Sequence, residues 1–298
     1  MGIALFSACI CVLTRAILNV CDRKIFKNSN TDFLKSIVYN SFFPFLLAIS
    51  TAYLFGDKNQ YFFTFILQPG VILSALAVQF TAYMFSYCFR KMTVKSIVIS
   101  SKMADVFIPL FVFFITNEFK TTEYYYSFIS TLLFIPILIS LLKNNSEFYF
   151  IPSLTIVLAL IFQAVINSYF SMHSYANTWP KFLSLMSCIL FWRSLFLLIP
   201  LCIQSMRSFQ KDDESNAKKV AYFTLFIRAF LAFVSQASFF YSITRLSSNA
   251  AWPILNSTPL VACFTAHVFL KEKVGKVEIG VFMFFILLSI FYVFMHWS

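Results

Sequence analysis

The 298-residue chain is 60% hydrophobic and 20% aromatic, and only 12% of its residues are charged. A soluble domain is about half apolar and about a quarter charged, so this composition excludes an ordinary soluble fold and points to lipid as the solvent. The formal net charge of +11 comes mostly from basic residues in short gaps between apolar runs, which is typical of polytopic membrane proteins. We therefore expect no nucleic-acid partner.

Ten apolar runs are long enough to cross a bilayer as helices, each near 20 residues. Barrel strands alternate apolar and polar residues, and these runs do not, so we expect an all-α integral membrane protein. The first run lacks the flanks of a signal peptide and is expected to be a retained span. In chain order the predicted spans are 3–21, 34–55, 68–89, 94–115, 124–142, 149–173, 182–204, 219–241, 249–270 and 275–296.

The segments between the runs are short and polar, for example "DRKIFKNSNTD" and "RSFQKDDESNAKK". None is long enough for a soluble domain. Loops that join an odd span to the next even one, counted with the first two residues of the span that follows, carry 15 Lys and Arg residues, against 4 on the other side. Basic loops are retained in the cytoplasm, so this bias predicts that both termini lie outside.

An internal repeat is visible at an offset of 154 residues, where "FSYCFRKMT…NEFK" aligns with "FFYSITRLSS…KEKV". Phe85 matches Phe239, Tyr87 matches Tyr241 and Glu118 matches Glu272. Two halves with five spans each have opposite orientations in the membrane, an arrangement that recurs among transporters. We therefore expect ten transmembrane helices in two inverted five-helix repeats, 1–143 and 144–298.

The second half resembles the EamA-type ten-helix members of the drug/metabolite transporter superfamily. The resemblance rests on "YSITRLSSNAAWPILNSTPLVACFTAHVFLKEKVGKVEIG", with Pro259 in the ninth span and Glu272 thirteen residues later. "FWRSLFLL" is similar to the family's arginine near the start of the second helix of a repeat. The first half departs from this pattern, since Asp105 and Tyr39 stand where the proline and the arginine would be.

"SSKMAD" is similar instead to the K-x-x-E-P pattern of the triose-phosphate and nucleotide-sugar branches, with Lys102 in the lysine position and Asp105 in place of the glutamate. Together these resemblances imply a transporter and not an enzyme. They imply no cofactor, and the sequence contains no metal-binding or nucleophile motif.

Charged residues within the spans give an independent indication of the site. A charge at the centre of a membrane helix costs about 2.5–3.5 kcal/mol, so such side chains face a bundle interior or water. Lys102 and Asp105, three residues apart, share one helix face and can pair. This pair either binds substrate or is a self-neutralised packing element. Arg15 is expected to line a cavity, Arg228 is either structural or cavity-lining, and Arg193 is expected to hold a helix end.

Further lining is expected from polar and aromatic residues of the third, eighth and ninth spans, with Asn256 opposite Lys102. Glu118 and Glu272 are expected to cap or anchor helix ends. The predicted substrate-binding residues are Lys102, Asp105, Arg15, Arg228, Asn256, Thr258, Trp252, Gln79 and Gln236.

These observations predict a secondary transporter of a small organic metabolite, with an anionic or phosphate-bearing one preferred and with proton or counter-substrate coupling. The alternatives are an exporter of amino acids or neutral drug-like compounds, and a non-transporting lipid-binding or assembly protein. The expected partners are the substrate and membrane lipid, in a monomer or a homodimer. The expected location is a bacterial inner membrane, with an organelle membrane as the alternative.

Overall fold

The computed structural model describes most of the chain, and every secondary-structure element in the described residues is helical. The described residues are 2–28, 33–55, 60–116, 125, 128–129, 131–137, 139, 150–170, 178–208, 222–245, 254–255 and 257–295.

Long helices occupy nine of the ten predicted spans. They are α1 (Gly2–Asn28), α2 (Phe33–Phe55), α4 (Pro69–Lys91), α5 (Val94–Thr116), α8 (Phe150–Tyr169), α10 (Trp179–Ser208), α11 (Tyr222–Arg245), α13 (Thr258–Leu270) and α14 (Lys276–Met295), and a short helix, α3 (Gln60–Phe65), lies between α2 and α4. The fifth predicted span, 124–142, is described only in part. Its Phe134 is buried with a ring centroid 5.7 Å from that of Phe285 in α14.

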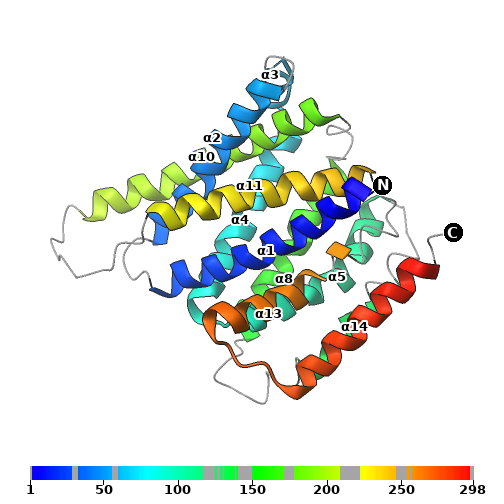
Figure 1. Cartoon of the computed structure of the whole chain (residues 1–298). Helices are drawn as coiled ribbons and strands as arrows, with labels where there is room; N and C mark the ends of the chain where they lie inside the picture. Colours follow the sequence, from blue (N-terminus) through cyan, green and yellow to red (C-terminus); the bar gives the residue numbers. More distant parts are fainter. Residues whose placement is uncertain are drawn as a thin grey trace.

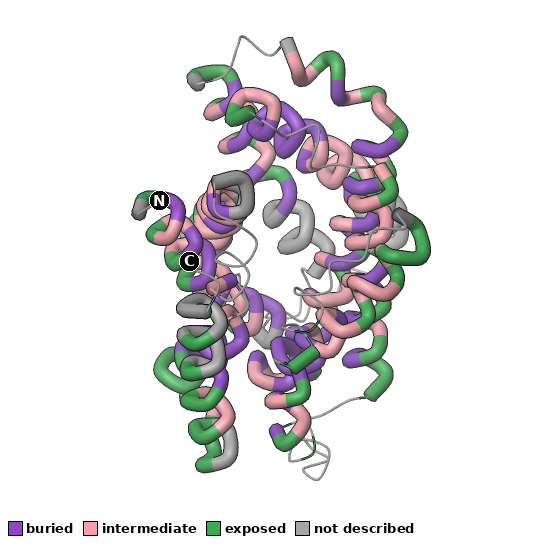
Figure 2. Tube along the Cα trace, turned by 90° about the vertical axis from the view of Figure 1, so that its right-hand side faces the viewer, coloured by how far each residue is buried: buried purple, intermediate pink, exposed green. Residues whose placement is uncertain are grey.

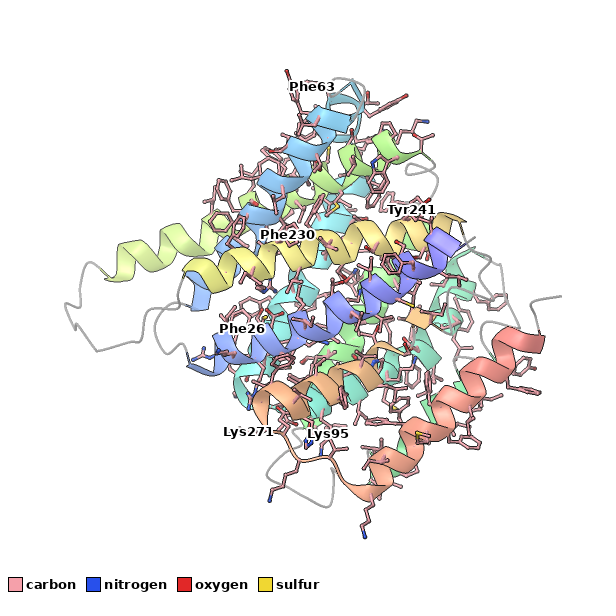
Figure 3. The ribbon with its side chains drawn as sticks, viewed as in Figure 1. Phe26, Phe63, Lys95, Phe230, Tyr241 and Lys271 are labelled. Carbon is pink, nitrogen blue, oxygen red and sulfur yellow. The ribbon has the colours of Figure 1, made fainter. Side chains whose placement is uncertain are left out.

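By length and composition, five helical segments among the described residues could cross a membrane: Ile3–Phe26, Pro69–Lys91, Val94–Ile115, Phe150–Tyr169 and Trp179–Leu198. Shorter apolar stretches lie in α2, α11 and α13. Many large apolar side chains are exposed, such as Phe63 and Phe230, and Figure 3 shows Phe63 at the outer tip of the bundle. An apolar exterior of this kind is what a lipid-facing surface requires.

The helices form one bundle (Figure 1), and both chain ends lie on the side opposite the α13–α14 connection. The most extensive packing is between α1 and α11, α2 and α10, and α5 and α8. α4 also packs on α8 and α10, α13 on α1 and α5, and α2 on α11. Buried segments face the inside of the bundle, and exposed segments lie mainly on its outside and along α14 (Figure 2).

One predicted boundary is wrong in a way that matters for function. The first span continues through residues 22–28, which the sequence predicts as a loop, because "DRKIFKN" contains neither proline nor glycine to end the helix. This extension places Asp22 on the buried face of α1.

In the ninth predicted span, residues 254–255 are helical and α13 begins at Thr258. Pro259 therefore lies in the first turn of α13, where a residue needs no backbone N–H for a hydrogen bond within the helix.

The anchoring role expected of Glu272 is confirmed. Its two carboxylate oxygens accept hydrogen bonds from the backbone N–H groups of Val94 (3.2 Å) and Lys95 (3.4 Å), the first residues of α5. A carboxylate at this position complements the positive end of the helix dipole. Figure 3 shows Lys95 and Lys271 close together at this junction of α5 and α13. Glu118 lies outside the described residues.

Candidate functional site

The buried polar side chains of the described residues include two groups with charges, one on α5 and one shared among five helices. The α5 group is the Lys102–Asp105 ion pair, whose predicted pairing the structure confirms. The second group comprises Asp22 of α1, Ser41 of α2, Gln79 of α4, Arg193 of α10 and Arg228 of α11. We call it the five-helix cluster.

Within the Lys102–Asp105 pair, the lysine is buried and the carboxylate is partly exposed. The Lys102 side chain is 3% exposed and that of Asp105 is 29% exposed, so solvent meets the carboxylate and not the ammonium. The backbone carbonyl of Lys102 accepts a hydrogen bond from Thr131 Oγ1 at 3.3 Å. In this conformation, a ligand could reach Lys102 only after the pair rearranges.

Asp22 and Arg228 form an ion pair within the five-helix cluster. Arg228 donates through Nε to Asp22 Oδ1 and through Nη2 to Asp22 Oδ2, the second bond at 3.0 Å. Such a two-pronged contact between a guanidinium and a carboxylate is geometrically specific. It joins the first helix of the chain to α11 across a sequence separation of 206 residues.

Gln79 links three helices through its carbonyl oxygen. Oε1 accepts a hydrogen bond from Arg193 Nε at 3.2 Å and another from Ser41 Oγ at 3.3 Å. The side chain is 7% exposed. Its amide nitrogen, Nε2, is buried and has no hydrogen-bond partner in the described part of the chain. Because an amide nitrogen only donates, the group that is missing here is an acceptor.

The expected position of Arg193 at a helix end is wrong. Arg193 lies midway along α10 (Trp179–Ser208), and Arg228 is close enough for the two charges to repel. The misplacement came from the family pattern, since Arg193 is also in the middle of the predicted span 182–204. Arg193 shares a face of α10 with Met186, Leu190 and Leu197, which are all buried. It therefore faces other helices and not lipid.

The remaining predicted residues lie in separate places. The guanidinium carbon of Arg15, midway along α1, is 4.5 Å from the ring centroid of Phe239 in α11, a cation–π contact. Gln236 is exposed on the same face of α11 as Arg228, two turns away. Thr258 Oγ1 donates to the Leu255 carbonyl at 2.6 Å, at the start of α13. Trp252 and Asn256 lie outside the described residues.

The structure thus joins Gln79 to Arg193 and Arg228 to Asp22, and it keeps Lys102 with Asp105. Neither Asp22 nor Ser41 is among the site residues predicted from the sequence. Asp22 was assigned to a loop, although the absence of a helix breaker after residue 21 was a usable signal. Ser41 carries no signal that distinguishes it from other serines in apolar spans.

The arrangement is suited to binding, since polar groups from five helices meet inside an apolar bundle.

A search of curated proteins finds no match for this sequence. Residues 182–295, which include α10, α11, α13 and α14, match the model of the EamA-like transporter family. Members of that family are transporters and not enzymes. Together with the apolar helices, the match supports a multi-pass membrane transporter of small molecules, in the drug/metabolite transporter superfamily.

Proposed function

We propose that the protein is a secondary transporter that carries a small organic anion by alternating access. The observation that carries this proposal is the charge balance of the bundle interior. Arg15, Lys102, Arg193 and Arg228 carry positive charge on membrane-spanning helices, and in the described residues only two carboxylates, Asp22 and Asp105, pair with them. An uncompensated cation in such a place is costly, and an anionic substrate would compensate it.

The proposed mechanism uses two five-helix halves, residues 1–143 and 144–298, that move relative to each other. The packing pattern supports this division. Exchanging α1, α2, α4 and α5 with α8, α10, α11 and α13 turns the α1–α11 contact into α8–α4, and the α5–α8 contact into α13–α1. The α2–α10 and α5–α13 contacts map onto themselves. A two-fold relation between inverted halves requires this pattern.

We place the substrate among the residues that the sequence analysis selected on α1, α4, α5, α11 and the start of α13. In the step we propose, a carboxylate or phosphate of the substrate displaces Asp105 from Lys102, and the freed Asp105 takes up a proton. While the site is empty, the ion pair with Asp105 compensates the charge of Lys102. Substrate movement and proton movement would then be coupled within one turn of α5.

Proteoliposomes test this function directly. Uptake and efflux are measured across pools of carboxylates, phosphate esters, amino acids and nucleotide sugars. We expect transport of an anion, and we expect Lys102→Gln to abolish it while the protein still folds. Asp105→Asn should transport weakly and without pH dependence. Transport restricted to amino acids or neutral compounds would favour the exporter alternative, and no transport of any pool would favour a non-transporting role.

A double variant separates binding from packing. If Lys102 and Asp105 only fill space, each single change should destabilise the fold, and Lys102→Met with Asp105→Leu should restore both stability and transport. A near wild-type transport rate for this double variant would overturn the proposed role of the pair.

A further inference from the structure

One edge of the Arg193 guanidinium, the edge with the two Nη groups, is accessible. Its Nε is engaged by Gln79 Oε1 at 3.2 Å. Its two Nη groups have no hydrogen-bond acceptor among the described residues, yet they are not sealed from solvent as Gln79 Nε2 is. The Nη edge of a guanidinium is the part that binds a carboxylate or phosphate through two parallel bonds.

This partial exposure is on the inner side of α10. Arg193 is half-buried, as are Ile189 and Phe196, whereas Met186, Leu190 and Leu197 are buried. Its Nε contacts Gln79 of α4, and Arg228 of α11 is close enough for the two charges to repel. The guanidinium of Arg193 therefore lies between helices.

The surroundings hold the guanidinium in place and leave its charge uncompensated. Ser41 Oγ and Arg193 Nε both bind Gln79 Oε1, which fixes the orientation of the amide and hence of the guanidinium plane. The neighbouring Arg228 is neutralised by Asp22. In the described residues no carboxylate pairs with Arg193, and the unfilled groups beside it, the Nη edge and Gln79 Nε2, are all donors.

We propose that Arg193 and Gln79 form an anion subsite, in which the Nη edge of Arg193 binds a carboxylate or phosphate group of the transported solute. This inference rests on the proposed function and gives the substrate a first contact. In the present conformation the Lys102 ammonium is buried and paired with Asp105, whereas the Nη edge of Arg193 is partly exposed. The anion would therefore meet Arg193 before the Lys102–Asp105 pair rearranges.

Thermal unfolding of the full-length protein, purified in neutral detergent, tests the subsite without requiring transport. Sodium phosphate and sodium succinate are titrated at constant ionic strength against chloride, and the rise in Tm gives an apparent Kd. Hydrogen bonds to a charged group contribute about 1.5–3 kcal/mol each, so Arg193→Gln should weaken binding roughly ten- to hundredfold. Arg193→Lys should keep part of the response, and Arg90→Gln, at an exposed position at the end of α4, should leave it unchanged.

A second variant covers the case in which Arg193→Gln does not fold. Gln79→Glu places a carboxylate against Arg193 and so fills the subsite from within. We expect Gln79→Glu to fold, to unfold at a higher temperature than wild type without added anion, and to lose the anion response. Ser50→Ala, at an exposed position on the same helix as Ser41 and outside the five-helix cluster, should keep the response.

The outcomes distinguish this inference from the proposed function. Anion transport by the wild type, with unchanged apparent Kd in Arg193→Gln or in Gln79→Glu, would overturn the subsite and leave the function standing. If the wild type neither transports an anion nor responds to one, the function itself is wrong. A rise in Tm with phosphatidylglycerol but not with soluble anions would assign the site to a lipid headgroup and would also overturn the inference.

Discussion

The Asp22–Arg228 pair offers the sharpest test of how the bundle is held together. The side chains are 7% and 11% exposed, and the pair makes two hydrogen bonds between α1 and α11. Removing one partner of a buried pair costs about 3–5 kcal/mol, because the other charge is left uncompensated. Asp22→Asn keeps the shape and one acceptor, and a single hydrogen bond contributes about 0.5–1.5 kcal/mol.

We therefore expect Asp22→Asn to lower the free energy of unfolding by roughly 2–4 kcal/mol. Since about 1.4 kcal/mol corresponds to a factor of ten, the folding equilibrium should shift by roughly thirty- to several-hundredfold. Denaturant unfolding in detergent, followed by tryptophan fluorescence, measures this change. Lys24→Gln, at an exposed position on the same helix, should change the free energy by less than about 0.5 kcal/mol.

The single variants Asp22→Leu and Arg228→Met and the double variant that combines them complete the cycle. Replacing a buried pair by apolar side chains of similar volume is often neutral or stabilising, so most of the lost stability should return. If Asp22→Asn is as stable as wild type, the pair does not support the fold and its contact between α1 and α11 is incidental. If the double variant is less stable than either single variant, the pair does more than neutralise charge.

Three further outcomes are expected. Glu272→Gln should weaken the cap on α5 by about 1 kcal/mol and speed amide hydrogen exchange at Val94 and Lys95; unchanged exchange would contradict the cap. Trp192→Phe should cost about 1 kcal/mol in unfolding free energy, because the 2.7 Å bond from the indole N–H to the Ile66 carbonyl is lost, and Trp179→Phe serves as the control. A reporter active only in the cytoplasm should be silent when fused to either terminus, and activity there would reverse the predicted orientation.

The sequence was informative where the cause of a feature is local. Apolar runs predicted the long helices, because spanning a bilayer demands length and apolar composition within one segment. The Lys102–Asp105 pair was predictable for the same reason, since residues three apart meet on one helix face. Glu272 was expected to cap or anchor a helix end, but the end that it caps, the start of α5, came from the structure.

Contacts between distant segments were beyond the reach of local patterns. Nothing in the sequence links Asp22 to Arg228, which is 206 residues away, or Gln79 to Arg193, 114 residues away. Both contacts depend on how α1, α4, α10 and α11 pack. The position of Arg193 was misjudged because a family motif located it and its place within its own apolar run was not used. Ordinary helix geometry would have placed it near the middle.

The two proposed halves differ at the position of Arg228, and this difference bears on the proposed alternating access. If the halves are related by the offset of 154 residues, the position that corresponds to Arg228 is Ser74 on α4. Ser74 is buried, and its hydroxyl has no partner in the described part of the chain. Ser74 carries no charge, so the two halves differ at this position. Ala176, which corresponds to Asp22, lies outside the described residues.

This asymmetry has a consequence for transport. In the proposed cycle, a movement that separates α1 from α11 at the Asp22–Arg228 pair would separate two charges, whereas Ser74 contributes no charge at the corresponding position of α4. A buried ion pair is lost at a cost of several kcal/mol unless another anion replaces the carboxylate. An anionic solute at the neighbouring Arg193 could supply that replacement for Arg228. The proposed substrate would then lower the barrier to opening one end only, so that the resting conformation of the empty transporter is closed at the Asp22–Arg228 end.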